Sequence, residues 1–107
     1  MRTAETYLIT FSIDINDNLL KQHKAVVETL EELGKNGNLL QYSRITYLLN
    51  STLNRDKIRD SLTNAMKRNG SDGRVLVIDV KLSGWAGHFH DSDGEMVGWL
   101  KKYVSMD

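Results

Sequence analysis

The densest set of potential metal ligands in the chain is the segment His88-Phe89-His90-Asp91-Ser92-Asp93. In an extended backbone, side chains two residues apart point to the same side, so His88 and His90 could face one ion together. Imidazole combined with carboxylate suits zinc, nickel or manganese. The candidate metal ligands are therefore His88, His90 and Asp91.

Two other interpretations of this segment stay open. Asp91, Ser92 and Asp93 come before a helical pattern, where such side chains commonly cap the helix. The segment also lacks a spacing held by a helix, such as His-Glu-x-x-His. Neighbouring imidazoles titrate near neutral pH, so the segment could instead respond to pH. We expect no resident cofactor, and a divalent cation is the one candidate that these residues suggest.

A second candidate site lies at the end of the first predicted strand, residues 7–14. Its residues alternate between an apolar face that begins with Tyr7 and a mostly polar face that contains Ser12 and Asp14. Asp14 and Asp79 could together hold a divalent cation that activates water for phosphodiester hydrolysis, although antiparallel neighbours would place them at opposite ends. The candidate catalytic residues are Asp14 and, nearby, Ser12. The alternative is a solvated aspartate at a strand end, a role that Asp79 could also have.

Aromatic and basic residues could together contact a single-stranded nucleic acid. Trp85, Phe89 and Trp99 could stack on bases, and Arg44 or Arg74 could bind phosphate. The alternative is that the aromatic residues belong to the core. The 14 basic and 14 acidic residues give zero formal net charge, which excludes binding through bulk charge and leaves only a local basic patch.

Composition limits the class of protein. A chain of 107 residues with 40% hydrophobic content is expected to form one domain, residues 1–107. The absence of cysteine excludes disulfides and thiolate chemistry. There is no apolar run of the length that a membrane span requires. We therefore expect a soluble cytoplasmic protein that has no membrane partner.

Hydrophobic periodicity predicts a first amphipathic helix that ends near Gly34. On its stripe, His23 is expected to pack rather than to bind a ligand. Apolar residues at three- and four-residue intervals form the rest of the stripe: Leu19, Leu20, Val26, Val27, Leu30 and Leu33.

The remaining pattern predicts three strands and two helices. Residues 39–49 could be one long strand, but two short strands joined near Ser43-Arg44 are favoured. A helix is expected between a cap at Asn54 and a break at Asn69-Gly70. Its many cations alternate with aspartates, which favours a solvated face with local ion pairs. Residues 74–80 form a nearly continuous apolar strand, which is typical of burial on both faces. Ser92 and Glu95 have capping-box spacing for a short final helix.

This order of elements predicts an α+β fold: a ferredoxin-like βαββαβ two-layer sandwich with an added C-terminal helix. Two helices would cover one face of a four-stranded antiparallel sheet. The other face would be bare, and a second copy of the chain is the simplest cover for it. The sequence therefore predicts a homodimer packed through or along the sheet.

Several short motifs resemble a known group. They are Tyr7-Leu8-Ile9-Thr10, Gln41-Tyr42-Ser43, Ser51-Thr52-Leu53 leading into Ile58-Arg59-Asp60-Ser61-Leu62, and Gly84-Trp85-Ala86-Gly87 before Gly98-Trp99-Leu100-Lys101. Together they resemble the SinR-like family of small bacterial proteins and, more distantly, CRISPR-associated protein 2 and virulence-associated protein D. The resemblance implies a ferredoxin-like fold, a dimer, and either nuclease or scaffold activity near RNA or DNA.

The chain departs from these relatives at the residue that matters most for catalysis. In the CRISPR-associated relatives an aspartate ends the first strand, whereas this chain has Ser12 there. A serine hydroxyl is a weak, uncharged ligand for a divalent cation. Asp14 is about 6–7 Å farther along the strand. We therefore favour a non-catalytic module, with a metal-dependent endoribonuclease or deoxyribonuclease as the alternative.

Overall fold

The computed structural model describes residues 3–13, 19–35, 38–70, 73–80 and 92–104. Within these residues the protein is an α+β fold with a four-stranded antiparallel sheet, in the order β2-β3-β1-β4. The elements along the chain are β1 (Glu5–Ser12), α1 (Leu19–Leu33), β2 (Leu39–Gln41), β3 (Thr46–Ser51), α2 (Arg55–Arg68), β4 (Arg74–Asp79) and α3 (Gly94–Tyr103).

Strand β1 lies in the centre of the sheet and pairs on both sides. It pairs with β3, where Leu8 lies opposite Leu48, and with β4, where Leu8 lies opposite Ile78. Both pairings are antiparallel. Because strand side chains alternate between faces, each such row continues across several strands on one face of the sheet.

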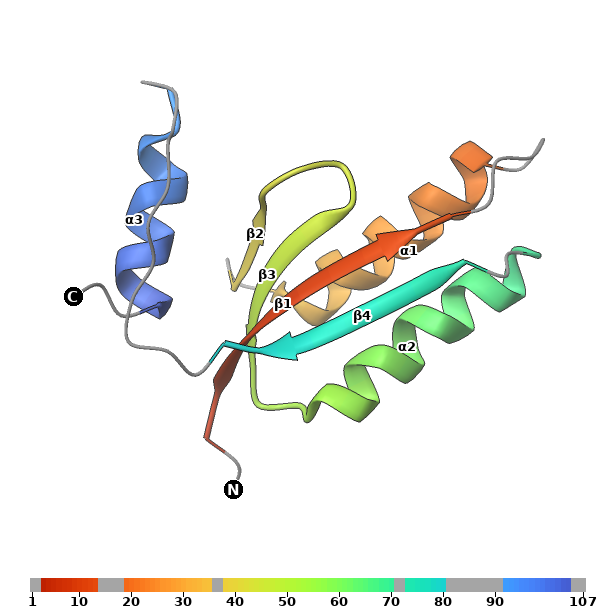
Figure 1. Cartoon of the computed structure of the whole chain (residues 1–107), viewed down its shortest axis with the longest axis horizontal. Coiled ribbons are helices and arrows are strands. Elements are labelled where there is room, and N and C mark those ends of the chain that lie inside the picture. Colours follow the sequence, from red (N-terminus) through yellow and green to blue (C-terminus); the bar gives the residue numbers. More distant parts are fainter. Residues whose placement is uncertain (1–2, 14–18, 36–37, 71–72, 81–91, 105–107) are drawn as a thin grey trace.

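Helices α1 and α2 pack beside each other on one face of the sheet (Figure 1). On that face β1 contributes Tyr7, Ile9 and Phe11, which are all buried, as the predicted alternation requires. The remaining members of the core are Val26, Leu30, Tyr47, Leu49, Ile58, Leu62 and Met66. The core therefore lies between this inner face and the two helices.

Residues 39–49 form two strands, as favoured from the sequence. The turn between β2 and β3 contains no glycine, and hydrogen bonds of Ser43 stabilise it. The Thr46 carbonyl accepts from the backbone N–H groups of Tyr42 and Ser43, at 2.9 and 3.1 Å. The Ser43 hydroxyl accepts from the backbone N–H of Ile45 at 3.3 Å. A serine turn of this kind replaces the glycine or asparagine that short hairpins usually contain.

The predicted stripe of α1 is wrong at one position. Leu20 is 84% exposed, and Gln22 is fully buried in its place. Gln22 lies one turn before Val26 on the buried side, and its Nε2 donates to the backbone carbonyl of Asn69 at 3.0 Å. A buried amide needs such a partner, and the partner comes from the end of α2, which the sequence of α1 alone could not reveal.

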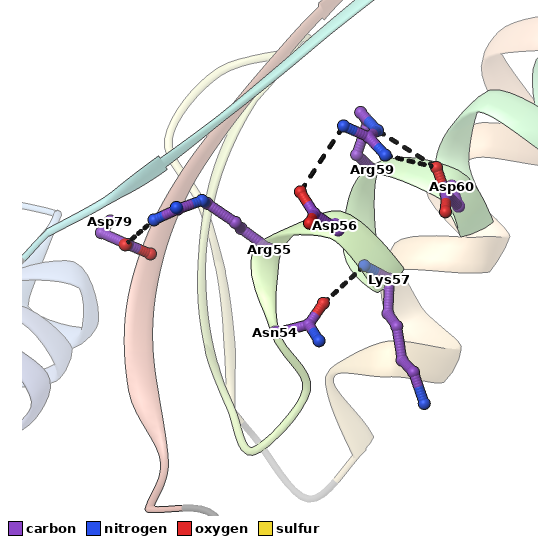
Figure 2. A network of polar contacts seen from close by, with 7 residues as sticks. All are labelled: Asn54, Arg55, Asp56, Lys57, Arg59, Asp60 and Asp79. Carbon is purple, nitrogen blue, oxygen red and sulfur yellow. Dashed lines mark hydrogen bonds and ion pairs between the residues drawn. The ribbon is translucent and has the colours of Figure 1, made fainter.

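The prediction for α2 is confirmed at both ends. The Asn54 side chain accepts from the Lys57 backbone N–H at 2.8 Å (Figure 2). At the other end the chain turns at Gly70, whose φ of 77° favours glycine. The predicted cap of α3 is wrong: the helix begins after Asp93 rather than Ser92. Ser92 therefore lies one residue before the N-cap position, and Ser92 and Glu95 do not have the positions of a capping box.

The cap of α2 gives a test of this fold. We expect Asn54→Ala to lower the free energy of unfolding by about 1 kcal/mol, because it leaves an N–H of the first turn without its acceptor. Asn64→Ala is the matched control, since Asn64 is exposed within the same helix and alanine favours helix there. Urea unfolding of both variants measures the difference. Equal stability of the two variants would contradict the role of the cap.

Candidate functional site

The candidate functional site is the face of the sheet turned away from α1 and α2, called here the outer face. Its residues alternate with the core residues on the same strands: Leu8, Thr10, Ser12, Thr46, Leu48, Arg74, Leu76 and Ile78. Leu76 is 54% exposed and Ile78 is 46% exposed. Large apolar side chains grouped at a surface indicate an interaction site more strongly than scattered ones do.

The pairing register divides the outer face into an apolar part and a polar part. One row is apolar throughout, with Leu8 between Leu48 and Ile78. In the next row Thr10 lies between Thr46 and Leu76, and the two threonine hydroxyls are 3.2 Å apart. Beyond it Ser12 lies opposite Arg74. The surface therefore changes along β1 from aliphatic to hydroxyl-bearing and cationic.

The C-terminal end of α3 covers one end of the outer face, so the prediction of a wholly bare face is wrong there. The Thr6 hydroxyl, which is buried, donates to the Tyr103 backbone carbonyl at 2.9 Å and accepts from Asn50 Nδ2 at 3.0 Å. The Tyr103 hydroxyl donates to Asn38 Oδ1 at 3.0 Å. These polar contacts fix α3 beside the start of β1, away from Leu76.

A shallow depression of about 530 Å³ lies at the opposite end of the outer face. It is lined by Thr10, Phe11, Ser12, Ile45, Arg74, Val75 and Leu76. Most of these side chains are apolar, and Arg74 is the only charged one. Gly73 allows β4 to begin here, because a Cβ at this position would overlap the carbonyl oxygen of Ser12. The depression suits an apolar group better than a metal ion.

The structure brings together three of the residues singled out from the sequence. Ser12 and Arg74 are cross-strand partners. Arg44 comes directly before Ile45, whose carbonyl accepts from the Phe11 backbone N–H at 3.0 Å. All three therefore belong to the same end of the sheet. The other predicted site residues lie outside the described residues: Asp14, Trp85, His88, His90 and Asp91.

Metal-binding geometry is not found in the described part of the chain, where no three histidine or acidic side chains group together. Asp79 lies opposite Tyr7, five residues from Ser12 and about 17 Å along the strand. Its Oδ2 binds Arg55, and its Oδ1 is buried with no partner among the described residues. Asp79 is therefore part of an ion pair far from the Ser12 end.

Two cations at the start of α2, Arg55 and Arg59, are paired with acids, as the sequence predicts. Arg55 binds Asp79 across to β4, and Arg59 contacts both Asp56 and Asp60 (Figure 2). Exposed pairs of this kind contribute little to stability, but they neutralise much of the positive charge on this surface. Lys57 remains without an acidic partner among the described residues, but a single ammonium group is fewer than the several clustered cations that binding of a phosphate backbone draws on.

His23 packs as predicted. Its ring lies 5.8 Å from that of Phe11, and its Nε2 is 2.9 Å from the Arg44 backbone carbonyl oxygen. It also borders a second hollow, between α1 and β3, which the sequence did not suggest. Tyr47 lines that hollow. Its hydroxyl is buried and has no partner among the described residues.

Burial raises the pKa of the Tyr47 hydroxyl above its usual value of 10.0, and the nearby negative charge of Glu31 adds to the effect. Both causes disfavour the phenolate. The signal in the sequence for a buried tyrosine here was its position in the alternating pattern of β3. That pattern does not show whether the hydroxyl group of Tyr47 will be buried or will have a hydrogen-bond partner.

Among the described helices, none has both the length and the apolar content needed to cross a membrane. Comparisons of the chain with models of protein families, with curated proteins and with solved structures found no match.

Two fully buried tyrosines provide a matched test of this geometry. Tyr7 donates its hydroxyl proton to the Leu53 carbonyl at 2.8 Å, so Tyr7→Phe should cost about 1 kcal/mol. Tyr47→Phe removes a hydroxyl that has no partner among the described residues and should change stability at neutral pH by less than about 0.5 kcal/mol. Urea unfolding of both variants at pH 7 measures this.

The raised pKa of Tyr47 also fixes the sign of a pH effect. Above pH 10 the unfolded chain loses the phenolic proton before the folded protein does, so stability falls as pH rises through this range. In Tyr47→Phe this part of the alkaline loss should be absent, and in Tyr7→Phe it should remain. An unchanged alkaline loss in Tyr47→Phe would contradict the assignment.

Proposed function

We propose that the protein is a non-catalytic homodimeric module of the ferredoxin-like class, in which a second copy packs through or along the sheet. The observation that carries this proposal is the exposure of Leu76 and Ile78 beside the aliphatic row of Leu8 and Leu48. The class is supported by the βαββαβ order of the first six elements and by the central position of β1 and β3.

Burial of this surface by a second copy is favourable on physical grounds. Complete burial of a leucine or isoleucine side chain is worth about 1.5–3 kcal/mol, so covering the exposed half of Leu76 and of Ile78 contributes about 1 kcal/mol each. In a two-fold symmetric dimer every such contact occurs twice. Zero formal net charge gives the two copies little overall repulsion.

The proposal of a non-catalytic role rests on the residues around Ser12. The hydroxyl of Ser12 brings no negative charge, and its cross-strand partner is Arg74. A guanidinium directly across the strand disfavours a divalent cation at this position. The same positive charge favours a phosphate. We therefore include RNA or DNA as a second partner of the Ser12 end, with Arg44 and Arg74 as the contact residues.

Light scattering tests the dimer. We expect the wild-type protein at high concentration to have twice the 12.2 kDa mass of the chain. The double variant Leu76→Lys with Ile78→Lys should be monomeric, because it places four charges in a two-fold interface. Leu20→Lys is the matched control: Leu20 is the most exposed of the large apolar residues described and lies on α1. A wild-type monomer, or a double variant that stays dimeric, would refute the proposal.

The alternative function, a metal-dependent nuclease that uses Asp14 and Ser12, has one supporting observation: Ser12 is exposed beside a cation that could hold a phosphate. Labelled RNA and DNA incubated with magnesium or manganese, and with chelator, test it. We expect any cleavage to be the same in the wild type and in Asp14→Ala, as from a contaminant. Cleavage that disappears in Asp14→Ala and with chelator would establish the nuclease.

A further inference from the structure

Strand β4 is one edge of the four-stranded sheet. The Val80 backbone N–H donates to the Thr6 carbonyl at 2.8 Å, and the antiparallel register continues along both strands. Because hydrogen-bonded positions alternate in such a pair, Leu76 and Ile78 direct their backbone groups toward β1. Val75 and Val77 therefore direct their N–H and C=O groups outward, where no described residue pairs with them.

The two edges of the sheet differ in how they are protected from pairing. At one edge, β2 has only three residues, and a short edge strand offers little to a partner. At the other edge, β4 has six residues, and its four central ones are Val75, Leu76, Val77 and Ile78. Proline and charged residues, which usually discourage pairing at an edge, are absent from this central part.

We propose that β4 pairs antiparallel with β4 of a second copy, around a two-fold axis that passes beside Val77. This inference rests on the proposed dimer and specifies where its two copies meet. It favours packing along the sheet, so that two four-stranded sheets join into one of eight strands. Helices α1 and α2 of both copies then lie on the same side.

Side-chain alternation limits the register to a few solutions. The inner faces of the two copies form one continuous face only if odd-numbered residues of β4 lie opposite odd-numbered residues of the second copy. Within β4, the residues with outward backbone groups are Val75, Val77 and Asp79, so these residues must pair among themselves. With Val77 opposite Val77 of the second copy, Leu76 lies opposite Ile78 of the second copy. The exposed aliphatic side chains of the two copies then meet in one row.

The charges of β4 favour a second copy in this orientation. The strand begins with Arg74 and ends with Asp79. Arg74 lies on the outer face, whereas Asp79 lies on the inner face and already pairs with Arg55. Antiparallel pairing keeps the two Arg74 side chains at opposite ends of the paired strands, whereas parallel pairing would bring these like charges together. The edge is therefore complementary to itself in backbone groups and in apolar side chains, and antiparallel pairing avoids contact between like charges.

Amide hydrogen exchange of the wild-type protein, followed by NMR, tests this inference without any substitution. In an edge-paired dimer, the amides of Val75 and Val77 should be protected at least tenfold, and their protection should fall on dilution into the monomer. The amides of Leu76 and Ile78 serve as internal controls, because their bonds to β1 persist in the monomer and their protection should change much less.

Each outcome separates this inference from the proposed dimer. A dimer by light scattering in which Val75 and Val77 exchange freely would refute edge pairing and leave a dimer formed through the outer face. A monomer at all concentrations would refute both. Protection of the two valine amides that persists unchanged in a demonstrated monomer would show that the chain itself covers this edge, and would also refute the inference.

A pair of variants gives a second readout. Val77→Pro removes the outward N–H, and an edge strand tolerates proline at such a position. Val77→Ala shortens the same side chain and keeps the N–H. We expect Val77→Pro to weaken dimerisation at least tenfold relative to Val77→Ala, with circular dichroism used to verify that both variants fold. Equal dimer affinity in the two variants would contradict pairing through this edge.

Discussion

The structure depends on the central position of β1, which hydrogen-bonds to β3 on one side and to β4 on the other. Its inward side chains, Tyr7, Ile9 and Phe11, are all buried against the helices. The ring of Phe11 stacks on Tyr47 with centroids 6.2 Å apart, and Tyr7 reaches the Leu53 carbonyl before α2. Strand β1 thus contacts the other strands of the sheet, both covering helices and the segment that precedes α2.

The same strand determines what the outer face offers to a partner. Because side chains alternate, fixing Tyr7, Ile9 and Phe11 inward places Leu8, Thr10 and Ser12 outward. The cross-strand neighbours then follow from register, and they produce an aliphatic region that changes to a hydroxyl-bearing, cationic end at Ser12 and Arg74. The composition of the outer face is therefore a direct consequence of how the core is packed, and a one-residue slip of β1 would exchange its inward and outward side chains.

Helix α3 limits this surface instead of belonging to the main core. Thr6 carries an outward side chain on β1, yet it is buried because its hydroxyl bonds to Tyr103 and Asn50. On α3 itself, the rings of Trp99 and Tyr103 pack at 4.6 Å, so this tryptophan contacts its own helix. Among the described strands of the outer face, the exposed aliphatic side chains are Leu76 and Ile78 of β4, at the edge of the sheet.

Local sequence determined the elements that depend on local chemistry. Alternation in residues 7–13 gave the buried side of β1, and Asn54 with Gly70 marked the two ends of α2. These signals were sufficient because a cap, a turn or an alternating strand involves residues close together in the chain. The α+β class and the four-stranded sheet followed from the order of such elements.

Only the tertiary structure decided the features that join distant residues. Gln22 is buried because Asn69, 47 residues later, accepts its amide proton, and Thr6 is buried because Tyr103, 97 residues later, covers it. The exposure of Leu76 and Ile78, in a strand whose composition is typical of full burial, follows from the position of β4 at the sheet edge. No periodicity contains this information, because burial is set by which elements meet in space.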